Sequence, residues 1–99
     1  MDYSFILRSE AVKEFADAYI WYEEQQEGLG DLFETKLQNK LNRICHYPFH
    51  YKTIHKNFHQ ALIDTFPFLI VYTIDEDLKQ IVVIAIFHTS RNPKKKFRK

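Results

Sequence analysis

The sequence predicts an α+β domain in which an N-terminal helix hairpin packs on one face of an antiparallel sheet. Residues 58–93 hold three runs rich in β-branched and aromatic residues, separated by turn residues. Residues 10–46 repeat apolar side chains every three or four positions, and Gly28 and Gly30 divide that region in two. Segregated helices and strands are typical of this class. The expected order is β-α-α-β-β-β, with room for one short strand before the last three.

The first expected elements are a short strand and a helix. Tyr3, Phe5 and Leu7 alternate with their neighbours and predict a strand that joins the later sheet. Ser9 is expected to cap a helix that runs to about Gln26. Its apolar stripe is expected to consist of Val12, Phe15, Ala16, Tyr19 and Tyr22, and its outer face of Lys13, Glu14, Asp17 and Glu24.

The second helix should begin at once after the glycine pair. A three-to-four-residue spacing continues to about His46, and Pro48 prevents much further extension. The apolar positions that keep this spacing are Leu29, Phe33, Leu37, Leu41 and Ile44. Residues 47–57 follow no clear pattern, and we expect a short edge strand there at most.

The last three strands form an expected meander over residues 58–64, 68–74 and 80–88. The second and third runs are nearly continuous in apolar residues, which indicates central strands. The first run is more polar and alternates, which is typical of a strand near an edge or around a functional surface. One face is expected to bear Phe58, Gln60, Leu62 and Asp64, and the other face His59, Ala61 and Ile63.

Length and charge indicate one domain over residues 1–93, followed by a basic and flexible tail over residues 94–99. Residues 1–93 carry nine basic residues against thirteen acidic ones, so the body is mildly acidic. The tail can attract a polyanion or an acidic partner, or it can serve solubility alone. Cys45 is the only cysteine, and the N-terminus lacks a long apolar run. We therefore expect a cytoplasmic protein with no membrane span.

Several kinds of chemistry find no support in the sequence. His55 and His59 have a spacing that would converge on a helix, but they fall in a loop that enters a strand, so we expect no metal site. Cys45 lies on the apolar side of the second helix and is expected in the core. Gly28 and Gly30 join two helices and do not follow a strand, which argues against a phosphate loop. We expect no cofactor.

The end of the meander is the one place that suggests acid-base chemistry. His88 and Arg91 stand together after the last strand, directly before the basic tail. A histidine beside an arginine suits proton transfer and phosphate binding in RNA cleavage. The alternative is that His88 ends the strand and bonds a neighbouring carbonyl.

Four segments of the chain carry a resemblance to a known family. They are WYEEQQEGLGDLF (residues 21–33), Tyr47-Pro48, ALIDTFPFLIVYTI (residues 61–74) and HTSRNP (residues 88–93). Their order and spacing resemble the RelE/ParE family of bacterial type II toxins, the plasmid stabilisation proteins. The family's fold is two N-terminal helices on an antiparallel sheet, which agrees with the periodicity above.

This resemblance implies a growth-inhibiting toxin that a cognate antitoxin neutralises. RelE-like members cut messenger RNA on the ribosome, whereas ParE-like members bind DNA gyrase without catalysis. Gln60 stands where the family commonly has arginine, and Phe97 stands where some of the nucleases have tyrosine. Phenylalanine cannot transfer a proton, and such nucleases tend to be strongly basic, whereas residues 1–93 are mildly acidic. With the missing arginine at Gln60, these departures lead us to expect gyrase binding. The alternatives are a ribosome-dependent mRNA endonuclease and a decayed, inert member of the family.

The resemblance also implies roles for particular residues. In a nuclease, His88 would be the acid or base and Arg91 would steady the charge of the scissile phosphate. Contacts to the target or to nucleic acid would come from the tail residues Lys94, Lys95, Lys96 and Arg98. The antitoxin would dock on the surface that bears Gln60, Leu62 and Asp64, or in the groove beside the helix hairpin, by strand addition or as a helix.

Overall fold

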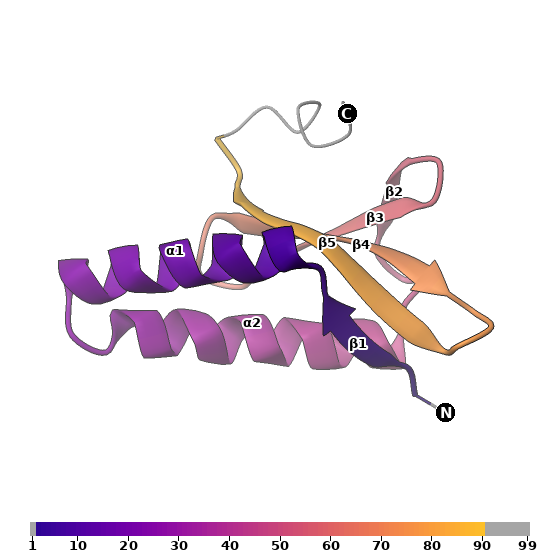
Figure 1. The fold of residues 1–99 in the computed structure, drawn as a ribbon, viewed down its shortest axis with the longest axis horizontal. Coiled ribbons are helices and arrows are strands. Elements are labelled where there is room, and N and C mark those ends of the chain that lie inside the picture. Colours follow the sequence, from indigo (N-terminus) through magenta and orange to yellow (C-terminus); the bar gives the residue numbers. More distant parts are fainter. Residues whose placement is uncertain (1, 91–99) are drawn as a thin grey trace.

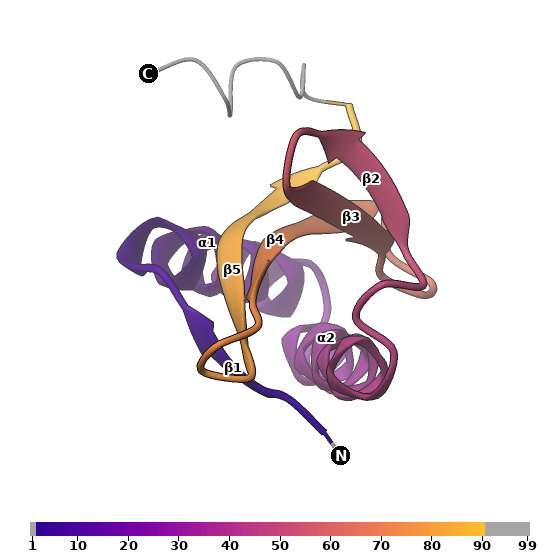
Figure 2. The ribbon, with the colours of Figure 1, turned by 90° about the vertical axis from the view of Figure 1, so that its right-hand side faces the viewer.

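The structure, a computed structural model, describes residues 2–90 and confirms the predicted α+β fold. Two helices lie side by side across one face of a five-stranded sheet (Figures 1 and 2). The elements in chain order are β1 (Ser4–Leu7), α1 (Ser9–Gln25), α2 (Leu29–His46), β2 (Lys52–His55), β3 (Phe58–Leu62), β4 (Phe68–Asp75) and β5 (Gln80–His88). The predicted bounds of α2 and β5 are confirmed, and residues 47–57 contain a short edge strand.

The strands lie in the order β1-β5-β4-β3-β2. The four strands β2 to β5 form an antiparallel meander, in which β4 and β5 are central as expected. β1 instead pairs in parallel with β5, from Ser4 opposite Gln80 to Leu7 opposite Val83. Two helices separate β1 from the meander, so no hairpin turn dictates its direction. The sheet is therefore mixed, with β1 at one edge and β2 at the other.

The main core lies between the helix hairpin and the sheet. Phe33 of α2 is completely buried at its centre, and Cys45 is buried there as predicted. Aromatic rings surround Phe33 with centroid separations of 5.0 to 5.9 Å, from Phe15, Tyr22, Phe66 and Phe68. A smaller cluster covers the opposite face of the sheet around the buried residues Val71, Ala85 and Phe87. Both faces of the central strands are thus covered, which explains their continuous apolar sequence.

The glycine turn between the helices is held by one carboxylate. The two oxygens of Glu23 accept hydrogen bonds from the backbone N–H groups of Gly28 and Gly30, at 2.8 and 2.7 Å. Those amides lie at the N-terminus of α2, where backbone donors lack helical partners and the helix dipole favours an anion. Gly28 has a φ of +89°, which requires glycine in practice. Glu23 and both glycines therefore stabilise the hairpin.

A second contact joins the two helices near the same turn. The Tyr19 hydroxyl donates a hydrogen bond of 2.5 Å to the carboxylate of Asp31. This hydrogen bond, with smaller contributions from desolvation and nearby acidic residues, raises the pKa of Tyr19 to about 12. The phenol therefore remains protonated, and remains a donor, throughout the physiological pH range.

The sequence-based prediction for α1 was wrong at the start of the helix and along its buried stripe. Arg8 is the N-cap and Ser9 is already helical, because the Arg8 N–H still bonds Val83 and pairing with the sheet continues to the start of the helix. The buried stripe contains Ala11 and Ala18, whereas Val12 and Ala16, which were expected in it, are exposed. The two buried alanines let α1 approach β5 closely. Apolar residues occur on several sides of α1, so its spacing alone did not identify the buried face.

Candidate functional site

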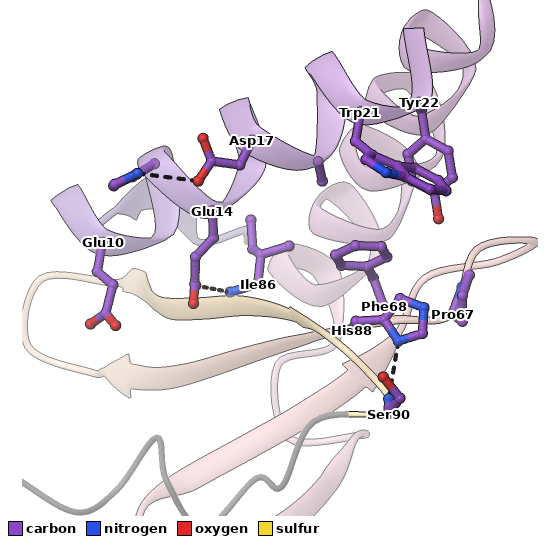
Figure 3. A pocket seen from close by; sticks show the side chains of 12 residues that line it. Glu10, Glu14, Asp17, Trp21, Tyr22, Pro67, Phe68, Ile86, His88 and Ser90 are labelled. Atoms are coloured by element: carbon purple, nitrogen blue, oxygen red, sulfur yellow. Dashed lines mark hydrogen bonds and ion pairs between the residues drawn. The ribbon is translucent and has the colours of Figure 1, made fainter. Parts of the chain in front are cut away.

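A groove of about 900 Å³ separates α1 from the end of the β4–β5 pair (Figure 3). Its floor is apolar and includes Tyr22, Phe68 and Ile86, and Trp21 stands at its rim with 56% of its surface exposed. Trp21 contacts the ring of Tyr22 edge-on, with centroids 5.2 Å apart. Large apolar surface around a concave site is typical of a binding groove. We call this region the α1–β5 groove.

The wall of the α1–β5 groove that α1 provides is acidic. Glu10, Glu14 and Asp17 line it, together with a single basic residue, Lys13. The ammonium of Lys13 pairs with Asp17 at 3.2 Å, which is the usual arrangement for charges four residues apart on a helix. The described part of the groove therefore has a negative balance of charge and would repel a polyanion.

Glu14 also contacts the backbone of the sheet. Its Oε1 accepts a hydrogen bond of 2.8 Å from the Ile86 N–H of β5. β1 pairs with β5 only as far as Val83, so this side of β5 has no described strand partner at Ile86. The prediction that Glu14 turns away from the fold was wrong, because a carboxylate satisfies this amide.

His88 lies where β5 ends, at one end of the α1–β5 groove (Figure 3). Its ring meets that of Phe68 edge-on at 5.3 Å. Its Nδ1 accepts a hydrogen bond of 3.1 Å from the Ser90 N–H, so a neutral His88 carries its proton on Nε2. The local bond expected at a strand end exists, but it joins the imidazole to an amide and not to a carbonyl.

The other predicted residues of this site belong to the end of the chain. Arg91 lies outside the described residues, and so do Lys94, Lys95, Lys96 and Arg98. Of the expected acid-base pair, the structure thus places His88 alone.

The structure brings together only two of the three residues predicted to bind the antitoxin. Gln60 and Leu62 lie on the face of β3 away from the helices, and Leu62 is exposed. Asp64 follows the end of β3 and forms an ion pair of 3.4 Å with Lys40 of α2. Because regular pairing stops at Leu62, the alternation of faces stops there too. β3 is also flanked by β2 and β4, so strand addition would require another edge.

His59 and Cys45 pack against other residues of the fold. His59 stacks on Tyr72 at 5.3 Å, and the Tyr72 hydroxyl donates a hydrogen bond of 2.7 Å to the carbonyl of Pro48. Burial raises the pKa of Tyr72 and, with help from the Asp2 carboxylate, that of the Cys45 thiol. Within residues 2–90, no three histidine, cysteine or acidic side chains gather closely enough to hold a metal ion.

The sequence analysis expected a docking groove beside the helix hairpin, but it did not identify the residues that line the α1–β5 groove, although their signal was present. Glu10, Glu14, Asp17 and Trp21 are four, three and four residues apart, which places them on one face of a helix. Three acidic residues and a tryptophan on one face suggest an exposed surface that binds a partner. What this face opposes could not be read from spacing, because Phe68 and His88 reach it only through the fold.

Comparison with known proteins gives a family and a fold. Residues 5–93 match the sequence model described as the ParE toxin of the type II toxin-antitoxin system parDE. No curated protein matches the chain. Neither described helix has the length and apolar character of a membrane-spanning segment.

Three solved structures share the fold at low identity. A mutant of the E. coli toxin RelE in the free state is 16% identical with a TM-score of 0.72, over 98% of this chain and 92% of that one. The chromosomal ParDE system of P. aeruginosa is 10% identical with a TM-score of 0.76, over 89% of this chain and 97% of that one. The intact E. coli RelBE toxin-antitoxin complex is 17% identical with a TM-score of 0.69, over 90% of this chain and 99% of that one. Likeness at such identity establishes the fold alone.

Proposed function

Because this chain belongs to the ParE toxin family of type II toxin-antitoxin systems, we propose that it inhibits growth by binding DNA gyrase in the bacterial cytoplasm. A cognate antitoxin then keeps the toxin inactive. The match to the ParE toxin sequence over residues 5–93 supports this choice of target, since ParE-like members act on gyrase without catalysis.

The observation that carries the proposal is the charge of the groove that His88 lines, within residues 2–90. A nuclease must stabilise the developing charge on a scissile phosphate and attract an RNA backbone. His88 instead lines the same groove as the carboxylates of Glu10, Glu14 and Asp17. Gln60 offers no guanidinium where the family commonly has one. These features favour a toxin that acts by binding a protein.

A pulse of expression in a bacterium tests the target. We expect DNA synthesis to stop before translation, with DNA breaks and intact mRNA. His88→Ala should keep its toxicity, because a binding surface depends little on one histidine. Labelled thymidine and labelled methionine, followed over the first minutes, measure the order of arrest.

The RelE-like alternative has one observation in its favour. The Ser90 N–H occupies Nδ1 of His88, so the neutral ring carries its proton on Nε2 and could donate a hydrogen bond from there to a phosphate oxygen. If this function is correct, translation stops first, mRNA is cut in phase with the ribosome, and His88→Ala abolishes both effects in a folded protein. Normal growth at high levels of folded toxin would instead indicate an inert member of the family.

We also propose that the antitoxin occupies the α1–β5 groove. The groove offers an apolar floor around Tyr22 and Phe68, acidic residues on one wall, and the side of β5 beyond its pairing with β1. A segment with an apolar anchor and flanking lysine or arginine residues would complement the floor and the acidic wall, and its backbone would lie along that side of β5. The opposite surface, with Gln60 and Leu62, remains a proposed second contact.

Truncation of Trp21 should weaken antitoxin binding about 30-fold, because a half-exposed tryptophan at a groove rim is a typical energetic centre of an interface. Isothermal titration of the purified antitoxin with Trp21→Ala measures the loss. Leu62→Ala reports on the opposite face, and Leu78→Ala, at an exposed turn, is the matched control. If Leu62→Ala weakens binding and Trp21→Ala does not, the antitoxin docks on the outer face of the sheet.

A further inference from the structure

The basic segment 91–99 begins beside an acidic groove. Its sequence, RNPKKKFRK, contains six basic residues and no acidic one, and the segment lies outside the described residues. Ser90, directly before it, lines the α1–β5 groove (Figure 3). Glu10, Glu14 and Asp17 line the same groove, and their spacing of four and three residues places them on one face of α1. We call these three residues the acidic wall.

The described lining of the groove has an excess of negative charge. The acidic wall contributes three carboxylates, and Lys13 contributes one ammonium, which pairs with Asp17 at 3.2 Å. With a neutral His88, one positive and three negative groups give a formal charge of −2. A concave surface lined by one sign of charge concentrates the opposite charge. The apolar floor beside the wall, which includes Tyr22 and Phe68, suits the aliphatic stems of arginine and lysine.

The segment 91–99 is long enough to follow the acidic wall. Six extended residues, such as 91–96, span up to about 20 Å. Glu10 and Asp17 are about 10 Å apart along the axis of α1. The acidic turn 75–77 precedes β5 and lies at least about 26 Å from His88 along that strand, so the acidic wall is the nearer partner.

Attachment beside the groove favours this contact over one with a dissolved polyanion. A short tether gives the attached group an effective concentration in the millimolar range. Exposed ion pairs are individually weak, so the contact requires several of them and is sensitive to salt. We therefore expect the contact in the free chain at low and moderate ionic strength.

We propose that the segment 91–99 docks along the acidic wall of the α1–β5 groove in the free chain, with its basic side chains facing the three carboxylates. The groove then supplies the acidic partner that the basic tail can attract. Docking would also hold the Arg91 guanidinium beside carboxylates and away from a phosphate. The proposal concerns this chain alone, so it does not depend on gyrase or on an antitoxin.

Paramagnetic NMR of the full chain tests the docking. Lys99→Cys provides the site for a spin label, and the native cysteine is buried and should not react. The label should broaden the amide signals of residues 10–14 several times more strongly than those of residues 65–68. The second set lies beside the start of the segment, because the Thr89 N–H donates a hydrogen bond of 2.8 Å to the Pro67 carbonyl. A segment with no preferred position would broaden residues 65–68 at least as strongly.

Charge reversal shows whether ion pairs cause the preference for residues 10–14. Reversal of either partner should abolish the preference, and the combination of both reversals should restore it. An increase from about 0.1 M to about 1 M salt shortens the Debye length from about 10 Å to about 3 Å and should abolish the preference in the parent. The reversed residues are Lys94→Glu, Lys95→Glu and Lys96→Glu in the segment, and Glu10→Lys and Asp17→Lys in the wall.

Glu34→Lys combined with Glu76→Lys is the matched control. It makes the same change of charge as the reversed wall, at exposed positions outside the lining of the groove, and should keep the preference of the parent. A mixture of isotope-labelled chain and spin-labelled chain tests docking onto a second copy. The proposal is wrong if residues 65–68 are broadened as strongly as residues 10–14, if either reversed variant keeps the preference, or if the mixture reproduces it.

Discussion

Phe33→Ala is expected to lower the free energy of unfolding by about 3–5 kcal/mol, the range for removing a buried aromatic ring. The side chain has no exposed surface, and its loss would leave a cavity that the neighbouring strands and helices could close only in part. The rings that would lose their partner belong to Phe15, Tyr22, Phe66 and Phe68. Since small domains are stable by about 5–15 kcal/mol, this loss removes a large fraction of the stability of the domain.

Urea denaturation followed by circular dichroism measures this effect. Leu32→Ala is the control next to Phe33 in sequence, and its exposed side chain should cost at most about 0.5 kcal/mol. A loss below about 1 kcal/mol for Phe33→Ala would mean that this ring is not the centre of the core. The toxicity of the same variant should fall in proportion to the fraction of the protein that is unfolded.

Gly30→Ala is expected to be the second most damaging change, at about 3 kcal/mol, because it combines overpacking with loss of a helix cap. A Cβ at this position would lie 2.6 Å from Oε1 of Glu23 and 2.7 Å from the backbone oxygen of Tyr19. The carboxylate could swing away, but it would then release the Gly28 and Gly30 amides. The backbone of α1 cannot move without disturbing the packed hairpin.

Gly28→Ala provides the matched control, since it tests the backbone alone. No atom lies within 4 Å of a Cβ built there, but a φ of +89° strains any other residue, at a cost of about 1–2 kcal/mol. Thermal unfolding of both variants in the Glu23→Ala background separates the two causes of the Gly30 effect. The Tyr19 contact predicts that much of the cost of Gly30→Ala remains in that background. Equal effects at the two glycines would contradict this account.

These contacts bear on what the family resemblance can reveal. Glu23, Gly28 and Gly30 belong to the segment that carries much of the resemblance, and each has a structural task in the helix hairpin. Such residues identify a fold and its family, and their structural contacts carry no information about the target. The choice between gyrase and the ribosome must therefore be decided by the surroundings of His88 and by experiment.

The sequence predicted those elements whose cause is local. The bounds of α2 followed from apolar spacing between a glycine turn and Pro48, and those of β5 from a continuous run of β-branched residues. The approximate place of His88 at a strand end followed in the same way. Hairpin connections set the antiparallel order of the last three strands, since such strands pair with their neighbours in the chain.

Only the tertiary structure decided the features that depend on which elements meet. α1 carries apolar residues on more than one side, so contact with β5 selected Ala11 and Ala18 over Val12 as its buried residues. The parallel pairing of β1 with β5 and the hydrogen bond from Ile86 to Glu14 each join residues more than 70 positions apart. The α1–β5 groove likewise depends on elements that are distant in the sequence. Periodicity shows which residues of a segment share a face, but it does not show which other part of the protein that face will contact.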